Sequence, residues 1–282
     1  MQTVLSIAFD GIAYGMVLFI ISIGLSIMMG LMRVVNLAHG AFAMIGGYLA
    51  SYAMRGLGMN YAIAIIAAVI GTIVISIPFE ILLYRRIYRK SDALTQLLLT
   101  IGITFFIIGV ANFLLGPTLK SIPLPAALSG PMDIGFRMVP THRIFVIACG
   151  VIVALLLWFL IEKTEFGVRL RASVDNSDMA DSLGIRTEWI YAATFALAVG
   201  LGAFGVVVGA ELMPIEPYYA LRYIVTFLVV VSVGGAGSIV GAIAASLLLG
   251  FADTTGKYLA PEYGEFFFYL VVILIVFMFP RG

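Results

Sequence analysis

Long uninterrupted apolar runs constrain this chain more than any other feature of its sequence. The runs reach about 18 residues or more, which is enough for a helix to cross the hydrocarbon core of a bilayer. Hydrophobic residues make up 62% of the 282 residues, and charged residues only 11%. A soluble domain has about 25% charged residues. The sequence therefore predicts a membrane protein that consists almost entirely of spans.

The spanning segments should be helices, because a helix satisfies every backbone polar group inside the segment. The alternating strands of about ten residues that mark a membrane barrel do not occur in the sequence. We predict an all-α, polytopic transmembrane helical bundle with eight or nine spans, in a single domain over residues 1–282. The first run lacks a basic leading segment and a clear cleavage site, so we interpret it as a retained span. The predicted spans are 4–31, 40–57, 61–84, 93–115, 142–161, 189–213, 218–234, 237–253 and 264–280.

The seventh and eighth spans come from one apolar stretch that a glycine cluster interrupts. The cluster reads GGAGS at residues 234–238. It is either a tight turn between two spans or a break inside one membrane helix. A break would make one of the pair re-entrant, and such backbone is tolerated only inside protein or against water. The sequence leaves both alternatives open.

Lysine and arginine in the short loops set the orientation, since they are enriched on the cytoplasmic side. Four of the seven residues 84–90 are basic, and the loop 162–188 holds four more basic residues. Both loops should face the cytoplasm, which with nine spans places the N-terminus outside. The loop 116–141 contains five prolines, so it should be an ordered, non-helical external segment.

The loop 162–188 is the one sizeable polar stretch, and it should contain a short helix. Asn176 or Ser177 can cap that helix, with Asp178 in its first turn near the positive end of the helix dipole. Gly184 then supplies the C-terminal stop. One interpretation is a stiff lever on the cytoplasmic surface that transmits force to the spans. The other is an ordinary amphipathic connector, which is common at membrane surfaces.

The same loop carries the most specific residue pattern in the chain. Asp178, Ala180 and Gly184 form an acid-x-Ala-x3-Gly pattern that resembles the coupling loop of bacterial ABC importer permeases. The longer run GVRLRASVDNSDMADSLGI at 167–185 looks like the version in the branched-chain amino acid permease family. One departure is that no apolar-Leu-Pro tail follows Gly184, whereas many other importers have one.

Two further stretches are similar to the same family, GLMRVVNLAHGAFAMIGGY at 30–48 and VGGAGSIVGAIAASLLLG at 233–250. Their order and spacing fit, and the resemblance spans nearly the whole chain. It implies the ABC importer permease fold, with a short cytoplasmic coupling helix in the loop 162–188. The residues then expected at the contact with an ATPase are Arg169, Arg171, Ala172, Asp175, Asn176, Asp178, Ala180, Leu183 and Gly184.

The resemblance implies a multi-pass permease subunit of the bacterial inner membrane. It would form half of a translocation pathway for branched-chain or other hydrophobic amino acids. Its partners would be a second homologous permease, two ATP-binding subunits at the cytoplasmic face, a periplasmic solute-binding protein and the lipid bilayer. Relatives also carry urea, short amides and aromatic acids, so the solute stays open.

The chain has no G-x4-G-K-[ST] phosphate loop. We therefore expect ATP and Mg²⁺ to bind to the partner ATPases, with no cofactor and no enzyme activity in this chain. A net charge of +1 gives no basic field for nucleic acid. Two other classes remain open: an ATP-independent secondary transporter or channel would need carboxylates at mid-membrane, and a membrane-embedded enzyme would need a clustered acid, base or nucleophile.

Polar residues at membrane depth are candidates for function because they are costly there. Arg33, Asn36 and His39 share one helical face if the segment is helical, and line a junction if Gly40 breaks the helix. They either gate the path near its cytoplasmic end, or Arg33 snorkels while the other two bridge neighbouring helices. The residues predicted to line the path or gate are Arg33, Asn36, His39, Gly40, Gly46, Gly234, Gly235 and Gly237. We expect no metal site, because His39 and His142 are the only histidines and should lie on opposite sides.

Several other polar groups have simpler expected partners. Glu80 should pair with an arginine of the adjacent basic cluster. Thr100, Thr104 and Asn112 lie in the fourth span, where we expect hydrogen bonds to other helices. At the predicted outer ends, glutamates 211 and 216 and arginine 222 should either pair with each other or meet a docking binding protein.

Overall fold

The computed structural model describes residues 2–87, 92–133, 135, 137–259, 261–262 and 264–278. Part of the basic loop that set the predicted orientation, residues 88–91, lies outside them, as does the basic residue near the C-terminus. The elements in chain order are α1 (Gln2–Leu31), α2 (His39–Arg55), α3 (Tyr61–Phe79), the π-helix η1 (Glu80–Tyr84), α4 (Arg85–Ile87), α5 (Ala93–Leu115), α6 (Ala126–Ser129), β1 (Pro131–Asp133), β2 (Met138–Pro140), α7 (Thr141–Lys163), α8 (Glu165–Asp175), α9 (Ser177–Ser182), α10 (Thr187–Val208), α11 (Tyr219–Gly234), α12 (Ile239–Leu259) and α13 (Gly264–Met278).

Among the described residues, six helices are long and apolar enough to cross a membrane: α1, α3 with η1, α5, α7, α10 and α12. The prediction of a polytopic all-α bundle is confirmed at this level. The other three predicted spans correspond to α2, α11 and α13, with 17, 16 and 15 residues. At about 1.5 Å per residue these helices are shorter than the ~30 Å hydrocarbon core. The count of eight or nine spans therefore stays a prediction.

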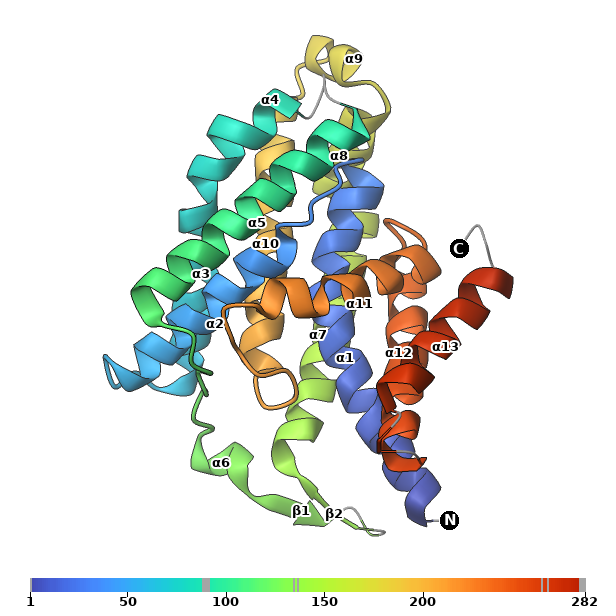
Figure 1. Cartoon of the computed structure of the whole chain (residues 1–282). Coiled ribbons are helices and arrows are strands. Elements are labelled where there is room, and N and C mark those ends of the chain that lie inside the picture. Colours follow the sequence, from blue (N-terminus) through green and yellow to red (C-terminus); the bar gives the residue numbers. More distant parts are fainter. Residues whose placement is uncertain are drawn as a thin grey trace.

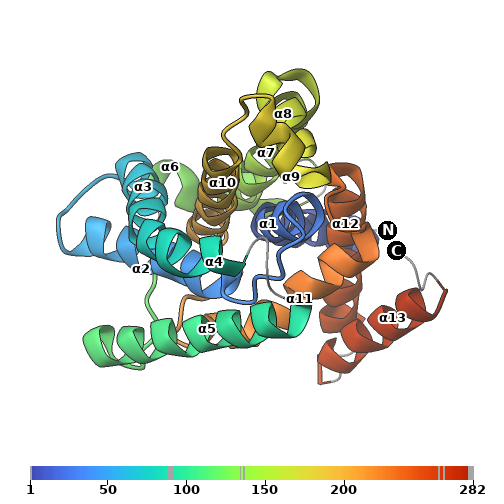
Figure 2. The same ribbon diagram turned by 90° about the horizontal axis from the view of Figure 1, so that it is seen from above.

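Helix α1 occupies the centre of the bundle, with α7, α10, α11 and α12 around it (Figure 2). Glycines allow this close packing. A Cβ atom built on Gly15 would lie 2.8 Å from the carbonyl oxygen of Ser246 in α12, and one on Gly24 would lie 2.5 Å from that of Ala198 in α10. Both distances are too short for a side chain, so the small residues set the spacing between the helices.

The two predicted loops lie at opposite ends of the bundle (Figure 1). Helices α4, α8 and α9 form one end, and α6 with the β1–β2 hairpin forms the other. Strands β1 and β2 pair antiparallel, with Pro131 opposite Pro140. Arg85 in α4 pairs with Glu188 at the start of α10 at 3.4 Å, and with Glu80 at 3.2 Å as the sequence predicted. The basic loops therefore share one end, as the predicted orientation requires.

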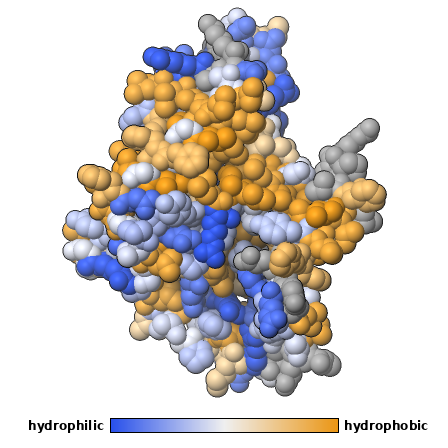
Figure 3. Space-filling model, in the orientation of Figure 1, coloured by the Kyte–Doolittle hydropathy of each residue, from blue (hydrophilic) through white to orange (hydrophobic). Residues whose placement is uncertain are grey.

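Helices α5, α11 and α13 lie along one side of the bundle (Figure 2). On this side the surface is apolar in a continuous band nearer the α8–α9 end, and mixed polar and apolar nearer the hairpin (Figure 3). Helix α5 contacts the rest of the bundle mainly through α2, and α13 mainly through α12. Much of their surface is therefore available to lipid or to another protein.

Candidate functional site

The predicted cytoplasmic loop folds into the helix pair α8–α9. Asn176 separates the two helices, and its side chain accepts a hydrogen bond from the backbone N–H of Met179 at 3.0 Å. After α9, Gly184 has a φ of +85°, and the N–H of Ile185 donates to the carbonyl of Ala180 at 3.0 Å. The helix thus begins and ends where the sequence predicted a cap and a glycine stop.

The α8–α9 pair is fixed to the long helix that follows it. Tyr191 of α10 donates its hydroxyl hydrogen to the carbonyl of Ser173 at 2.7 Å. The Asp181 carboxylate accepts bonds from the backbone N–H and the hydroxyl of Thr187, at 3.2 and 2.8 Å. Because α8 also follows directly from α7, the pair connects two long helices rigidly.

Apolar side chains are exposed on this otherwise charged end. Met179, Leu183 and Trp189 are 62%, 76% and 67% exposed. Exposed apolar groups that cluster at a polar end make this a candidate interaction surface. A hollow of about 460 Å³ lies beside them, lined by Arg169, Leu183, Gly184, Ile185, Arg186, Trp189 and Ile190.

The nine predicted coupling residues differ in exposure. Ala180 is buried at 2% exposure, so it packs within the element and does not reach its outer surface. Two others, Arg171 and Ala172, are half-buried. The exposed ones are Arg169, Asp175, Asn176, Asp178, Leu183 and Gly184.

Residues 32–38 between α1 and α2 are non-helical. The alternative in which Arg33, Asn36 and His39 share a helical face is therefore wrong, because α2 begins only at His39. The break also comes before Gly40 and not at it. Arg33 has a φ of +54°, which is rare for a residue with a side chain, and it is exposed.

Asn36 and His39 are buried and bonded within the bundle. The Asn36 carbonyl oxygen accepts from the N–H of Ala38 at 3.0 Å and from the hydroxyl of Tyr84 at 2.6 Å. His39 donates through Nε2 to the carbonyl of Ile21 at 2.8 Å. This geometry matches the interpretation in which the two side chains bridge neighbouring helices.

The predicted path glycines of α2 lie at helix contacts. A Cβ on Gly40 would lie 3.2 Å from Cα of Ala220 in α11, and one on Gly46 would lie 2.5 Å from the methyl group of Ala203 in α10. Small residues at these places let three helices approach one another closely. The contacts assign the two glycines a packing role.

The glycine cluster after α11 forms a tight turn into α12. Gly235 and Gly237 have φ values of +79° and +85°, a region that glycine adopts at little cost. The N–H of Gly237 donates to the Ser26 hydroxyl oxygen at 3.0 Å, and a Cβ on Gly30 would lie 2.1 Å from the nitrogen of Gly237. The turn therefore packs directly against the end of α1, and α11 and α12 are separate helices.

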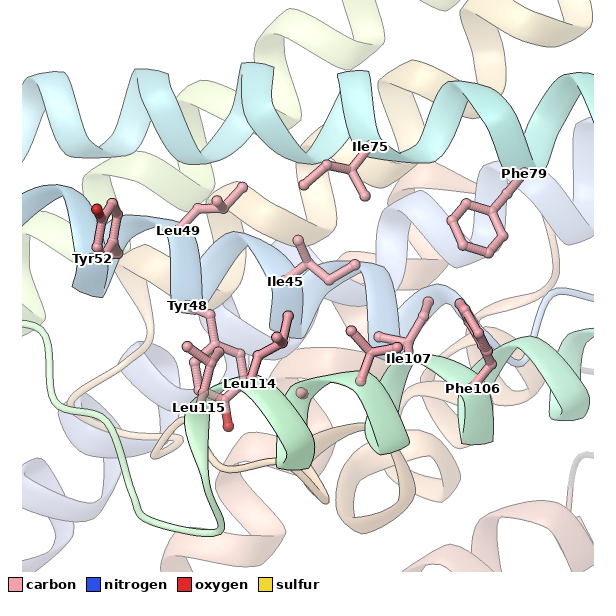
Figure 4. A pocket seen from close by; sticks show the side chains of 12 residues that line it. Ile45, Tyr48, Leu49, Tyr52, Ile75, Phe79, Phe106, Ile107, Leu114 and Leu115 are labelled. Atoms are coloured by element: carbon pink, nitrogen blue, oxygen red, sulfur yellow. The ribbon is translucent and has the colours of Figure 1, made fainter.

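Two of the cavities lined by described residues lie between the long helices. The first, of about 450 Å³, is an open apolar groove between α2, α3 and α5 (Figure 4). Its labelled side chains come from all three helices and include Tyr48, Phe79 and Phe106. The second, of about 370 Å³, is lined by Tyr14, Leu212, Pro214, Arg222, Tyr223, Thr226, Asp253, Lys257, Phe268 and Tyr269.

The sequence analysis singled out only Arg222 among the residues of this second cavity. It missed Asp253 and Lys257, which pair at 2.6 Å one helical turn apart on α12. The signal was present, since an acid followed four residues later by a base at the end of an apolar run is unusual. Arg222 pairs with Glu216 at 2.8 Å, in agreement with one of its two predicted roles.

No group of three or more His, Cys, Asp or Glu side chains that could hold a metal ion occurs within the described part of the chain. His39 is bonded in the interior near α10, whereas His142 begins the first turn of α7 at the hairpin end and contacts Glu211 at 2.8 Å.

Comparison with known proteins identifies the family. Residues 7–276 match the model of the branched-chain amino acid transport system permease component. The permease LivH of Escherichia coli K12, from the high-affinity branched-chain amino acid transport system, is 28% identical over 97% of this chain and 93% of its own. BraD of Pseudomonas aeruginosa, from a system of the same name, is 26% identical with the same coverage. A probable LivH permease of Methanocaldococcus jannaschii is 27% identical over 95% of this chain and 86% of its own.

No solved structure matches the chain. The family match covers nearly every described residue, and it joins the three stretches on which the sequence resemblance rested. Together with six helices long enough to span, it places the chain in the inner membrane as a multi-pass protein. The chain therefore belongs to the family of permease components of branched-chain amino acid transport systems, the membrane subunits of ABC importers.

Proposed function

We propose that the chain forms half of the translocation pathway of an ATP-driven importer for branched-chain or other hydrophobic amino acids. A second, homologous permease supplies the other half. Two ATP-binding subunits drive the cycle from the α8–α9 end, and a solute-binding protein delivers the solute at the hairpin end. In this arrangement α2, α11 and α13 complete a bundle of nine spans. Similarity over 97% of the chain to permeases named for branched-chain amino acids supports the proposal.

The α8–α9 element is the structural feature that best supports the proposal that a separate ATPase powers transport. It exposes Met179 and Leu183 on its outer side, while Tyr191 and Asp181 fix its inner side to α10. A force applied to the exposed side would reach α7 and α10 without being lost in a flexible loop. Such an element is suited to couple nucleotide-driven motion to the bundle.

The side of α5, α11 and α13 is where we place the second permease. The Arg222 side chain on α11 is 55% exposed even though it pairs with Glu216. A charged group facing lipid tails is costly. A protein partner or a water-filled path between two permeases would remove that cost, and lipid alone would not.

The proposal is tested by reconstituting the permease with its partner permease, both ATPases and the binding protein in proteoliposomes. We expect ATP-dependent uptake of labelled leucine, isoleucine or valine. Urea, short amides and aromatic acids are screened in parallel, because related permeases carry them. Uptake that continues without ATP and follows an ion gradient would instead identify a secondary transporter.

A matched pair of variants tests the coupling surface. Met179→Asp places a charge on the α8–α9 surface, and Met138→Asp places one on the hairpin at the other end, where the side chain is similarly exposed at 70%. We expect Met179→Asp to lose co-purification with the ATPases, because it puts a charge into an apolar contact. Met138→Asp should retain it. Equal retention by both variants would exclude α8–α9 as the docking site.

A further inference from the structure

The polar cavity between α1, α11, α12 and α13 is unusual for a bundle of this composition. Its lining holds three charged side chains, Arg222, Asp253 and Lys257, together with the tyrosines 14, 223 and 269. The first cavity, the apolar groove of Figure 4, is of similar size and is lined by no charged side chain. Ionisable groups inside membrane bundles are costly and generally serve function.

The charged side chains of the cavity come from two helices. On α12, Lys257 Nζ lies 2.6 Å from the Asp253 carboxylate, which is 9% exposed by residue. On α11, Arg222 lies 2.8 Å from Glu216, which precedes the helix and does not line the cavity. The cavity is thus lined by two cations and one carboxylate.

Aromatic rings hold both cations in place. Lys257 Nζ lies 5.2 Å from the ring centre of Tyr14 in α1, and the Arg222 guanidinium lies 5.5 Å from that of Tyr223. A cation over an aromatic face is attracted to it and keeps its hydrogen-bond donors available on the other sides. The two cations are therefore each positioned by an aromatic ring as well as by a carboxylate.

The cavity lies in the half of the bundle nearer the hairpin. Tyr258, the next residue after Lys257, donates to Asp10 of α1 at 2.7 Å, and Asp10 also accepts from Arg137 beside the hairpin at 2.5 Å. Tyr14 lies one helical turn further into the bundle. A solute that enters at the hairpin end would meet this cavity early.

We propose that this cavity binds the amino-acid zwitterion on its way through the permease. Arg222 and Lys257 receive the α-carboxylate, and Asp253 receives the α-ammonium group. Phe268 of α13 and Leu212 offer apolar surface for the side chain. The assignment rests on the proposed function, and it adds a site for the charged backbone of the solute.

The existing ion pairs explain why such a site would be transient. Each cation already has a carboxylate partner, so a bound zwitterion exchanges one set of charge-assisted bonds for another. The net gain is small, and a site on a transport path must release its solute as readily as it accepts it. A solute without charges, such as urea, would offer only neutral hydrogen bonds, which are weaker than the charge-assisted bonds it would replace.

Saturation-transfer NMR on the complex of both permeases and both ATPases tests the assignment directly. The complex is placed in nanodiscs of phosphatidylglycerol, which excludes zwitterionic headgroups from the cavity, and the binding protein is omitted. The ligands are leucine, isoamylamine without the carboxylate, and 4-methylpentanoate without the ammonium. We expect leucine to bind in the millimolar range, and each analogue to bind about tenfold more weakly or worse.

Two charge-neutralising variants then identify the partners. In Asp253→Asn, the affinity for leucine should fall about tenfold, to that of 4-methylpentanoate, because the ammonium group has lost its partner. In Arg222→Gln, the affinity for leucine should fall toward that of isoamylamine, because the carboxylate has lost a partner. Asp133→Asn on the external hairpin is the matched control and should bind leucine as the wild type does. If the variants lower the affinity for all three ligands by the same factor, the two residues have a structural role, and the assignment is overturned.

Uptake by the complete system separates the two levels of the proposal. If the wild type imports leucine with ATP but shows no saturation transfer, the cavity is not a solute site and the importer assignment stands. The same conclusion follows if both variants bind and import leucine like the wild type. If the wild type imports no amino acid under any condition, the proposed function fails and the zwitterion site fails with it.

Discussion

The two ends of the bundle are held together in different ways. At the α8–α9 end, Asn176 caps its helix through the N–H of Met179, three residues away. At the hairpin end, Asp10 accepts bonds from Arg143 and Tyr258, which lie 133 and 248 positions further along the chain. At the first end, the α8–α9 pair takes its shape mainly from local contacts and is attached as one unit to α7 and α10. The second joins α1, α7 and α12 into one cross-linked structure.

This difference fits the roles proposed for the two ends. A lever must keep its own shape while it transmits force to α7 and α10, so part of its stability should come from its own residues. An entrance that receives solute must keep its shape, so its elements should be tied to one another. Variants at each end test whether the two ends are stabilised in these different ways.

The largest effect is expected for Asp10→Asn. The carboxylate is 10% exposed and bridges Arg137 and Arg143, which are 24% and 26% exposed. Breaking a buried charge cluster on one side leaves cations without a partner and costs about 3 kcal/mol. We expect a lower midpoint of thermal unfolding and faster proteolysis within the hairpin. Asp133→Asn is the control: it removes a hydrogen-bond acceptor within a single turn and should lower the free energy of unfolding by less than about 0.5 kcal/mol.

A smaller effect is expected at the other end for Gly167→Ala. A Cβ at this position would lie 1.8 Å from the carbonyl oxygen of Ile161, so α8 must shift away from the end of α7. Overpacking of this kind costs about 2 kcal/mol. We expect reduced uptake per ATP hydrolysed by the reconstituted complex.

The control for this variant is Gly130→Ala at the hairpin end. No heavy atom lies within 4 Å of a Cβ built there, so stability and coupling should not change. If Gly167→Ala takes up as much solute per ATP hydrolysed as the wild type, α8 tolerates a changed packing position against the end of α7. The rigid connection between the two helices would then not be needed for transport.

Asn176→Ala tests the local construction of the lever with a more modest change. It removes the side-chain acceptor of the α9 cap, which is worth about 1 kcal/mol. Asn176→Asp should restore the cap and most of the stability, because aspartate accepts the same bond. Hydrogen exchange of the α9 amides reads out the change, and equal exchange in all three proteins would contradict a stabilising cap.

The locality of these contacts also decided what could be predicted from the sequence. The cap at Asn176 and the stop at Gly184 were predictable because each is defined within a few residues. The six long apolar runs were predictable because length and hydropathy alone identify a span. The pairing of Glu80 with a nearby arginine is local as well.

Contacts between distant segments were not predictable in the same way. Nothing in the sequence joins Asp10 to Tyr258 or brings Tyr14 beside Lys257. One prediction placed contacts between helices where the structure has contacts within a helix. Thr100 and Thr104 were expected to bond to other helices, yet each donates to a carbonyl of its own helix, four residues back, at 2.9 and 2.8 Å. The Asn112 amide does the same at 3.1 Å.

The left-handed backbone conformation of Arg33 is a local feature that the sequence did not reveal. Its removal gives the smallest expected effect. Its φ of +54° is strained for any residue with a Cβ, and its side chain is exposed. Arg33→Gly should therefore stabilise the chain by about 0.5 kcal/mol, after the entropy that glycine adds to the unfolded chain is subtracted. Thermal unfolding measures that gain, and ATP-driven uptake measures whether the charge matters for transport.

Arg33→Asn completes this test, because asparagine tolerates the same backbone conformation and also lacks the charge. If both variants are at least as stable as the wild type and transport normally, Arg33 has no part in a gate. If both lose transport while they remain stable, the strain at this position is retained for the sake of the charge. The α1–α2 junction would then be a functional element at the same end of the bundle as α8–α9.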